Sequence, residues 1–397
     1  MASSRKNRSL YIDAQAVSAL CLAKAGLLFP VERLMSKSES DSLMASNALE
    51  AKEFPFPFFL TPSGQRNIEV LKEAKKGDCL DLFSNGEPVG NICVDEIFEI
   101  DKSERLKQIY GTDNLTHPGV EATAARLGPF SVSGEYTINL TNIKANIELI
   151  SKFKEQISAK HVTGMMIAAN PLHRGHEKVI RHALETTDLV VLFLLKPFDN
   201  DNGLDYQIRY DILHDYVSNY LPKNRVLIVP FENNYLFAGF NEIVLDAIVA
   251  KNYGCNRLII GNNHAGIGMY YDHNMNKSII DTLDGIDIEV EIVSEFVYCN
   301  ICKTLVSVKT CPHGQHHHIS YHSESILELM KTGLLPPAVL MRKELSSMVL
   351  GHLFPNRFKN LEKLYYDIMP NVGILEEHND KDFYLALMNL YQTTSLN

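Results

Sequence analysis

Apolar and polar positions follow different periods in different parts of the chain. In the first 160 residues, short apolar runs are separated by turn-forming residues, as in FPFPFFL at 54–60 and the two alternating runs that flank Asn85-Gly86. An Asn-Gly pair between such runs is typical of a β-hairpin turn. The stretch 112–134 is polar and rich in Gly and Pro, which indicates the end of a domain. We therefore expect residues 1–160 to form a β-rich domain that begins with a helical segment.

From residue 161 the pattern changes to continuous apolar runs separated by amphipathic segments. The runs are expected to be strands, and they are VTGMMIAA at 162–169, LVVLFLL at 189–195, RVLIVPF at 225–231, RLIIG at 257–261 and IDIEVEIV at 286–293. The segments between them have helical periodicity, at about 175–187, 206–220 and 241–252. Continuous apolar strands between helices predict a parallel sheet that is covered on both faces. Residues 161–295 are therefore expected to form an α/β, Rossmann-like domain that binds its ligand beyond the carboxyl ends of the strands.

Composition and charge exclude several classes of protein. The chain has 397 residues, of which 45% are apolar and 22% charged, as in a folded soluble protein of several domains. Its formal net charge of −10 argues against a general nucleic-acid binder or a binder of anionic membranes. No apolar run is long enough to span a membrane. Asp13, Gln15 and Lys24 interrupt the apolar patch near the start, so we expect no targeting peptide and a cytoplasmic protein.

The seven cysteines fall into a scattered group and a cluster. The scattered cysteines are Cys21, Cys79, Cys93 and Cys255. The cluster is Cys299, Cys302 and Cys311, with a Cys-x2-Cys pair and nearby histidines. This spacing is typical of a tetrahedral Cys₃His zinc site, so we interpret the cluster as metal ligands rather than as part of a disulfide framework.

The fourth zinc ligand is not fixed by the spacing, because His313, His316, His317 and His318 all follow Cys311. We choose His316. With all four positions filled, the Zn²⁺ would be structural and would stabilise a small C-terminal subdomain, residues 296–397, that continues as a helical tail. The alternative is a set of reduced thiols beside a solvated histidine run.

The segment Asn170-Pro171-Leu172-His173-Arg174-Gly175-His176 lies between the first expected strand of the α/β domain and its helix. Two histidines three residues apart share one face at the start of that helix, where the helix dipole is positive and backbone N–H groups are unpaired. Imidazole N–H groups there are suited to donate to the phosphates of a nucleotide and to stabilise charge on a leaving pyrophosphate. The alternative is a helix cap with surface histidines.

A second candidate loop, Gly261 to Gly268, directly follows the strand RLIIG. Its sequence is GNNHAGIG, and glycines at the end of a strand let backbone amides approach a ligand closely. His264 is placed to reach the same pocket as His173 and His176, because all three follow strands of one sheet.

Several motifs together resemble the ATP sulfurylase family, whose members make adenylyl sulfate and pyrophosphate from ATP and sulfate. NPLHRGH resembles the family's Asn-Pro-Leu-His-Arg-Ala/Gly-His block, and GNNHAGIG resembles its Gly-Arg-Asp-His-Ala-Gly loop. HPGV at 117–120, EFPFPFFL, AGFNEIVLDAIVAKNYGC and the stretch from CNICKTLVSVKTCPHG to LPPAVLMRKEL are similar too. The resemblance covers about residues 20–350 in the expected order.

The resemblance implies a PUA-like N-terminal domain, a Rossmann-like adenylyltransferase domain and, as in some bacterial members, a zinc site. It implies direct attack of an acceptor oxyanion on the α-phosphorus of ATP, with Mg²⁺ on the triphosphate. Asn170, His173 and His176 are the expected catalytic residues. The expected nucleotide-binding residues are these three with Arg174, Gly261, Asn262, His264, Ala265 and Gly266.

The chain departs from the family on the side of the site that holds sulfate. The family's Gln-Thr-Arg-Asn is here Ile167-Ala168-Ala169-Asn170, its Arg-Asp before His-Ala-Gly is Asn262-Asn263, and its Met-Arg-Tyr-Ala-Gly-Pro-Arg is the segment 235–241. Four expected arginines are absent. Sulfate is a dianion that needs charge-assisted donors, and Ile167 and Ala169 supply none.

The sequence therefore predicts a transferase of sulfate assimilation that makes adenylyl sulfate, with ATP and a small oxyanion as partners. Two alternatives stay open: the same transfer to a different, less charged acceptor, and a nucleotide-binding pseudoenzyme. Arg174, Lys196 and Arg209 are the candidates to supply the missing charge. We expect no nucleic-acid or membrane partner, and a homo-oligomer is left open.

Overall fold

The computed structural model describes residues 8–45, 54–196, 203–232, 239–261, 285–357 and 379–391. The chain divides into two compact units, one made of residues 1–166 and 229–292, the other of residues 167–228 and 293–397. The expected division at residues 160 and 295 into three domains stays a prediction.

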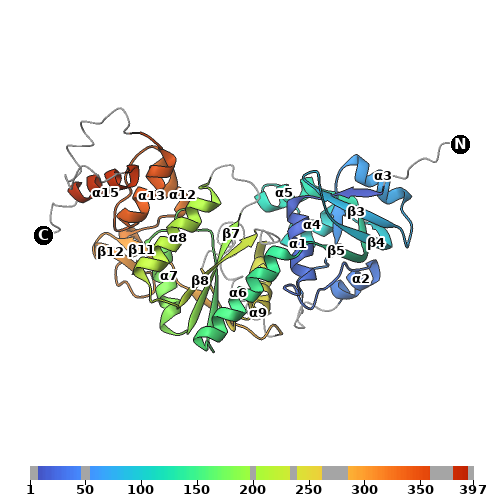
Figure 1. Ribbon diagram of the computed structural model, residues 1–397, viewed down its shortest axis with the longest axis horizontal. Helices are drawn as coiled ribbons and strands as arrows, with labels where there is room; N and C mark the ends of the chain where they lie inside the picture. Colours follow the sequence, from blue (N-terminus) through green and yellow to red (C-terminus); the bar gives the residue numbers. More distant parts are fainter. Residues whose placement is uncertain are drawn as a thin grey trace. The chain divides into compact units, whose positions relative to one another are not determined.

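The N-terminal part of the chain is built on a five-stranded sheet (Figure 1). Its strand order is β1-β3-β4-β5-β2, and its strands are β1 (Ser9–Tyr11), β2 (Leu60–Pro62), β3 (Cys79–Ser84), β4 (Glu87–Glu99) and β5 (Leu127–Ile138). β1 pairs with β3 in parallel, and the other pairs are antiparallel. The accompanying helices are α1 (Ala14–Lys24), α2 (Lys37–Ala45), α3 (Gln65–Glu73), α4 (Lys102–Tyr110) and α5 (Pro118–Arg126). The expected β-rich fold is confirmed, whereas the expected helical start differs: the short strand β1 precedes helix α1.

The β3–β4 hairpin turns at Asn85-Gly86, as expected, and both residues have positive φ angles, 50° and 83°. Its register places Cys79 opposite Cys93, and the two form a disulfide. From the sequence these two cysteines were only counted among the scattered ones, and no disulfide was expected; the structure differs on this point. The hairpin brings them together because they lie at nearly equal distances from the turn, a relation that scattered spacing does not reveal.

Two expectations for this domain differ from the structure. Residues 54–59 of FPFPFFL are not in a strand, since the two prolines lack the N–H groups that a sheet requires. The stretch 112–134 does not close the domain but forms helix α5 and most of β5, which pairs with both β4 and β2. Small residues such as Gly128 and Gly134 are needed there, because a Cβ at either position would lie within 2.3 Å of a neighbouring backbone oxygen.

A second five-stranded sheet has the order β10-β9-β6-β7-β8. Its strands are β6 (Val162–Ile167), β7 (Leu189–Lys196), β8 (Val226–Glu232), β9 (Arg257–Gly261) and β10 (Glu289–Val293), and each falls in an expected apolar run. β6 and β9 are parallel. Six consecutive residues of β7, from Leu189 to Leu194, have no exposed surface, as expected for a strand covered on both faces.

The helices of this region also match the sequence pattern. They are α7 (Arg174–Glu185), α8 (Tyr206–Tyr220) and α9 (Glu242–Asn252), the last preceded by a 3₁₀ turn, η1 (Gly239–Asn241). The expected α/β architecture is confirmed. Helix α6 (Thr141–Ile157) was not expected, because the sequence analysis assigned its residues to the β-rich domain.

The C-terminal region contains a small antiparallel sheet and several helices (Figure 1). The sheet has the order β12-β11-β13, with β11 (Phe296–Cys299), β12 (Thr304–Ser307) and β13 (His318–Ile319). The helices are α12 (Ser323–Lys331), α13 (Lys343–Leu353) and α15 (Asp380–Tyr391), with a 3₁₀ turn, η4 (Gln315–His317), before β13. Among the described residues, no helix is both long enough and apolar enough to cross a membrane.

Candidate active site and metal centre

The turn between β6 and α7 is a part of the candidate active site that lies wholly within the described residues. Its backbone is specialised: Ala169 has a φ of 49°, and the Asn170–Pro171 peptide bond is cis. Leu172 is fully buried and anchors the turn in the core. The Asn170 side chain accepts a hydrogen bond from the Leu204 N–H at 2.8 Å, which ties the turn to the segment before α8.

His173 and His176 cap the start of α7 reciprocally. Nδ1 of His173 accepts the backbone N–H of Gly175 at 3.1 Å, and Nδ1 of His176 accepts the backbone N–H of His173 at 3.2 Å. A backbone N–H is always a donor, so both Nδ1 atoms are unprotonated and both rings carry their proton on Nε2. Neither Nε2–H has a hydrogen-bond partner among the described residues. The caps therefore leave two imidazole donors free at the amino end of a helix.

The two rings are held neutral by their surroundings. They stack with centroids 3.9 Å apart, and Tyr321 packs edge-on against His173 at 5.2 Å. Burial lowers the pKa of His176 to about 4. Burial, together with repulsion from His176 and His322, lowers the pKa of His173 well below its usual range. At neutral pH the pair thus donates hydrogen bonds without carrying charge.

A buried ion-pair network fixes the first turn of α7. Glu177, 4% exposed, bonds to Nε of Arg342 at 2.9 Å and lies 3.2 Å from Nη1 of Arg174. Arg174 also bonds to the carbonyls of Ala338 and Leu340, through its side chain and its backbone N–H respectively. The LPPAVLMRKEL block of the sequence therefore contributes to the site by holding α7. Removing one partner of such a buried pair is strongly destabilising.

The expected nucleotide-binding residues are only partly described. Asn170, His173, Arg174 and His176 lie together at the β6–α7 turn. Gly261 ends β9, while Asn262, His264, Ala265 and Gly266 lie outside the described residues. The roles assigned to all these residues stay predictions.

Two of the positions that differ from the family pattern, Ile167 and Ala169, are apolar and buried. Ile167 is 2% exposed and Ala169 is fully buried. Neither presents a donor to an anion, as expected from the sequence.

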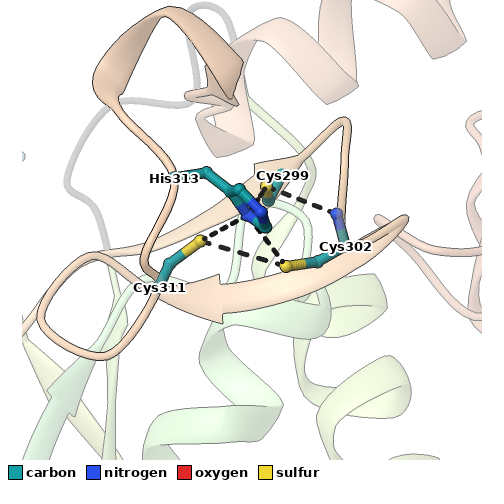
Figure 2. Close-up of side chains that lie close together, drawn as sticks. All are labelled: Cys299, Cys302, Cys311 and His313. Atoms are coloured by element: carbon teal, nitrogen blue, oxygen red, sulfur yellow. Dashed lines mark hydrogen bonds between the residues drawn. The ribbon is translucent and has the colours of Figure 1, made fainter.

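The cysteine cluster brings four ligand atoms together (Figure 2). Cys299 ends β11, Cys302 lies in the turn before β12, and Cys311 and His313 follow β12. Nδ1 of His313 lies 3.4, 3.3 and 3.5 Å from the sulfur atoms of Cys299, Cys302 and Cys311. The sulfurs of Cys302 and Cys311 are 4.0 Å apart.

These distances fit Zn²⁺. Tetrahedral zinc with ordinary bond lengths separates two sulfurs by about 3.8 Å and a sulfur from a nitrogen by about 3.6 Å. Burial raises the pKa of the Cys299 thiol, but hydrogen bonds from the backbone N–H groups of Cys302 and Ile301 and from neighbouring thiols bring it to about 6. The thiolate form is therefore accessible at neutral pH for Cys299, whereas burial and the neighbouring sulfurs raise the pKa of the Cys302 thiol to about 11.

The structure places His313, and not His316, with the three cysteines. His313 lies two residues after Cys311 at the end of the same turn. His316 belongs to the 3₁₀ turn η4, and its ring lies 4.1 Å from that of His317. This geometry corrects the choice of His316 to His313, because in η4 the ring of His316 lies against that of His317.

Sequence reasoning missed three contributors to the site: Glu177, Arg342 and Tyr321. Glu177 follows directly after the histidine motif, and a charged residue on the core face of a helix was a usable signal. Arg342 and Tyr321 are more than 140 residues away in sequence from the start of α7, so no local pattern could reveal that they contact it.

Comparisons with known proteins agree with the motifs. A family model for ATP-sulfurylase matches residues 143–352, and a model for a PUA-like domain matches residues 1–140. The chain belongs to the ATP-sulfurylase family. The resemblance seen in the sequence, including the PUA-like N-terminal domain, is thereby confirmed.

Individual relatives are distant but similar over most of their length. The sulfate adenylyltransferase of Chloroflexus aurantiacus J-10-fl is 28% identical over 86% of this chain and 90% of its own. The sulfate adenylyltransferase of Staphylothermus marinus is 28% identical over 72% of this chain and 76% of its own. Among solved structures, the hexameric APS kinase from Thiobacillus denitrificans matches with a TM-score of 0.62 and 16% identity, over 87% of this chain and 63% of that chain. This last likeness shows the fold alone.

The lowered pKa values predict a specific loss of stability in acid. In the unfolded chain, His176 binds a proton as pH falls through its usual pKa near 6.5. In the folded chain, it binds that proton only when pH falls to about 4. Its stabilising contribution is thus full above pH 6.5 and is lost as pH falls toward 4. At pH 5 we expect a loss of about 2 kcal/mol from this residue.

Urea unfolding at pH 7.5 and pH 5.0 measures this loss. His176→Gln removes the titrating group. Between pH 7.5 and pH 5.0, the free energy of unfolding of this variant should therefore decrease by about 2 kcal/mol less than that of the wild type. Equal pH dependence in the two proteins would contradict the account.

The metal centre predicts that Zn²⁺ binds the full chain and raises its unfolding temperature. His313→Ala should weaken zinc binding about 100-fold or more, because a ligand is lost, whereas His316→Ala should leave it unchanged. A chelator competition titration measures both. Equal affinities for His313→Ala and the wild type would rule out this ligand set.

Proposed function

We propose that this chain transfers the adenylyl group of ATP to a small oxyanion and releases pyrophosphate. The observation that carries the proposal is the reciprocal cap at His173 and His176, which leaves two neutral N–H donors at the amino end of α7. An anion is stabilised at such a helix end by the dipole and by unpaired backbone N–H groups. The names of the relatives, sulfate adenylyltransferases, support the same chemistry.

In the proposed reaction an acceptor oxygen forms a bond to the α-phosphorus of ATP. The bond from that phosphorus to the oxygen bridging to the β-phosphorus breaks, and its electron pair leaves with pyrophosphate. The Nε2–H groups of His173 and His176 donate to phosphate oxygens, where negative charge develops, and Asn170 orients the α-phosphate. Mg²⁺ bound to the triphosphate neutralises part of its charge. Catalysis of this kind is positioning and charge stabilisation, with no covalent enzyme intermediate.

Sulfate is the first choice of acceptor, on the evidence of the relatives' names. A second candidate is a less charged acceptor, favoured by the buried apolar side chains of Ile167 and Ala169. The Gly261–Gly266 loop, including Asn262, His264 and Ala265, is proposed to hold the nucleotide. We also propose a structural Zn²⁺ on Cys299, Cys302, Cys311 and His313, a cytoplasmic location and assembly into a homo-oligomer.

The reverse reaction tests the proposal: adenylyl sulfate, pyrophosphate and Mg²⁺ are supplied, and ATP formation is measured. We expect ATP to form, and His173→Ala with His176→Ala to lower the rate by a factor of about 10² or more, as for the loss of positioned donors. His214→Ala on the exposed face of α8 is the matched control and should leave the rate unchanged.

The outcomes separate the candidate acceptors. If no ATP forms although MgATP binds, sulfate is excluded as the acceptor. Ile167→Gln with Ala169→Arg should then create activity with sulfate if the lost donors are the cause. MgATP binding with no turnover on any acceptor would contradict the proposed transferase and favour a nucleotide-binding pseudoenzyme.

A further inference from the structure

Arg209 of α8 is a buried cation that forms no ion pair with any described residue. The side chain is 3% exposed, and its Nη1 donates a hydrogen bond to the carbonyl oxygen of Ala168 at 2.8 Å. Its Nε and Nη2 atoms are buried and have no hydrogen-bond partner among the residues that the structure describes. No carboxylate of the described residues forms an ion pair with it. The nearest compensation is the ring of Tyr206, whose centroid is 5.8 Å from the guanidinium carbon.

An unpaired buried charge is costly, so proteins rarely keep one without a use. Burial lowers the pKa of Arg209, which is the direction expected when no anion offsets the charge. An arginine nevertheless stays protonated at neutral pH. Within the described part of the chain, this positive charge therefore lacks a counter-charge.

The other candidate cations near the turn are already engaged or exposed. Arg174 lies 3.2 Å from the carboxylate of Glu177 and bonds to the carbonyl of Ala338. Lys196, at the end of β7, is exposed to solvent. Of these three cations, Arg209 is thus the buried one whose charge no described carboxylate compensates.

Its position is the carboxyl end of β6, where the turn to α7 begins. Ala168 directly precedes Ala169 and Asn170, and the Asn170 side chain is tied to Leu204 just before α8. The Ala168 carbonyl oxygen would repel an anion bound at this strand end. By donating to that oxygen, Arg209 reduces the repulsion and adds a positive field.

We propose that Arg209 is the charge that binds an oxyanion at the β6–α7 turn, in place of the donors missing at Ile167 and Ala169. The inference rests on the proposed function for the identity of the anion, which is either the pyrophosphate portion of ATP or the acceptor. Arg209 acts from behind the turn, through its field and through Ala168, and the anion is its missing counter-charge.

The proposal predicts opposite effects on ligand binding and on stability. Arg209→Gln keeps a donor for the Ala168 carbonyl but removes the charge. Its unfolding temperature without anions should equal or exceed that of the wild type, because a buried unpaired charge is gone. Its affinity for the anion should fall about tenfold or more, as for the loss of a charge-assisted interaction. Arg209→Lys keeps the charge and should retain most of the affinity.

Arg225 supplies the matched control. Its guanidinium is hydrogen-bonded to the carbonyls of Leu184, Thr187 and Asp188, which is a purely structural role. Arg225→Met should therefore lower the unfolding temperature and leave anion affinity unchanged. The two arginines together distinguish a binding charge from a structural clamp.

The experiment is thermal unfolding of the full chain, titrated with magnesium pyrophosphate or with sodium sulfate at constant ionic strength. A loss of affinity confined to pyrophosphate places the Arg209 charge at the leaving group, and a loss confined to sulfate places it at the acceptor. Wild-type affinity in Arg209→Gln would overturn the proposal. So would a lowered unfolding temperature in both Arg209→Gln and Arg209→Lys, which would show a structural role.

The result is separable from the test of the proposed function. Anion binding that depends on Arg209, in a protein that forms no ATP from adenylyl sulfate, would leave this inference standing and the sulfate reaction excluded. If the wild type forms ATP but Arg209→Gln binds the anions with wild-type affinity, the proposed function would stand and this inference would be overturned. A wild-type protein that binds neither anion would overturn both.

Discussion

The reciprocal cap between His173 and His176 is the constraint on which the candidate site depends. A helix that begins at Arg174 leaves backbone N–H groups without acceptors, and two imidazole Nδ1 atoms satisfy them. That arrangement fixes the tautomer of both rings and turns each Nε2–H into a donor. A carboxylate, which is one of the common helix caps, would offer no donor to an anion and would repel it. Here the cap and the binding group are the same side chain.

The charges around this cap are arranged so that the donors stay neutral while the surroundings are positive. Glu177, the buried carboxylate nearest in sequence, is neutralised by Arg174 and Arg342. The guanidinium of Arg342 also lies 3.8 Å from the ring centroid of Tyr220, which fixes its orientation. Among the described groups, the positive end of α7 and the guanidinium of Arg209 remain at the turn without a paired carboxylate. An anion is thus the ligand that this electrostatic balance favours.

The strands of the α/β region were predictable because the apolar sequence of each strand is contained in one short segment. A strand buried on both faces must be continuously apolar, and Leu189–Leu194 shows this directly. The Asn85-Gly86 turn was predictable for a similar reason, since its backbone conformation favours these residues. Strand β5 was missed because it contains small and polar residues, some of which lie close to neighbouring backbone, and such a composition is typical of a loop.

The site was predictable where its residues are adjacent and unpredictable where folding brings them together. NPLHRGH is one continuous segment, so its position between a strand and a helix could be read from the pattern. The contact of Arg342 with Glu177 and the pairing of Cys79 with Cys93 depend on register and packing that no short window contains. The histidine that joins the cysteine cluster depends on local geometry as well: His313 lies with the three sulfurs, while His316 is in the 3₁₀ turn η4.

The protonation state of His173 and His176 is the most direct test of this account. Nitrogen-15 NMR of the histidine side chains at pH 7, with resonances assigned through His173→Gln and His176→Gln, reports which ring nitrogen carries the proton. The account predicts that both rings are neutral and protonated on Nε2, with Nδ1 bare. A proton on Nδ1 of either ring, or a charged imidazolium at this pH, would contradict it.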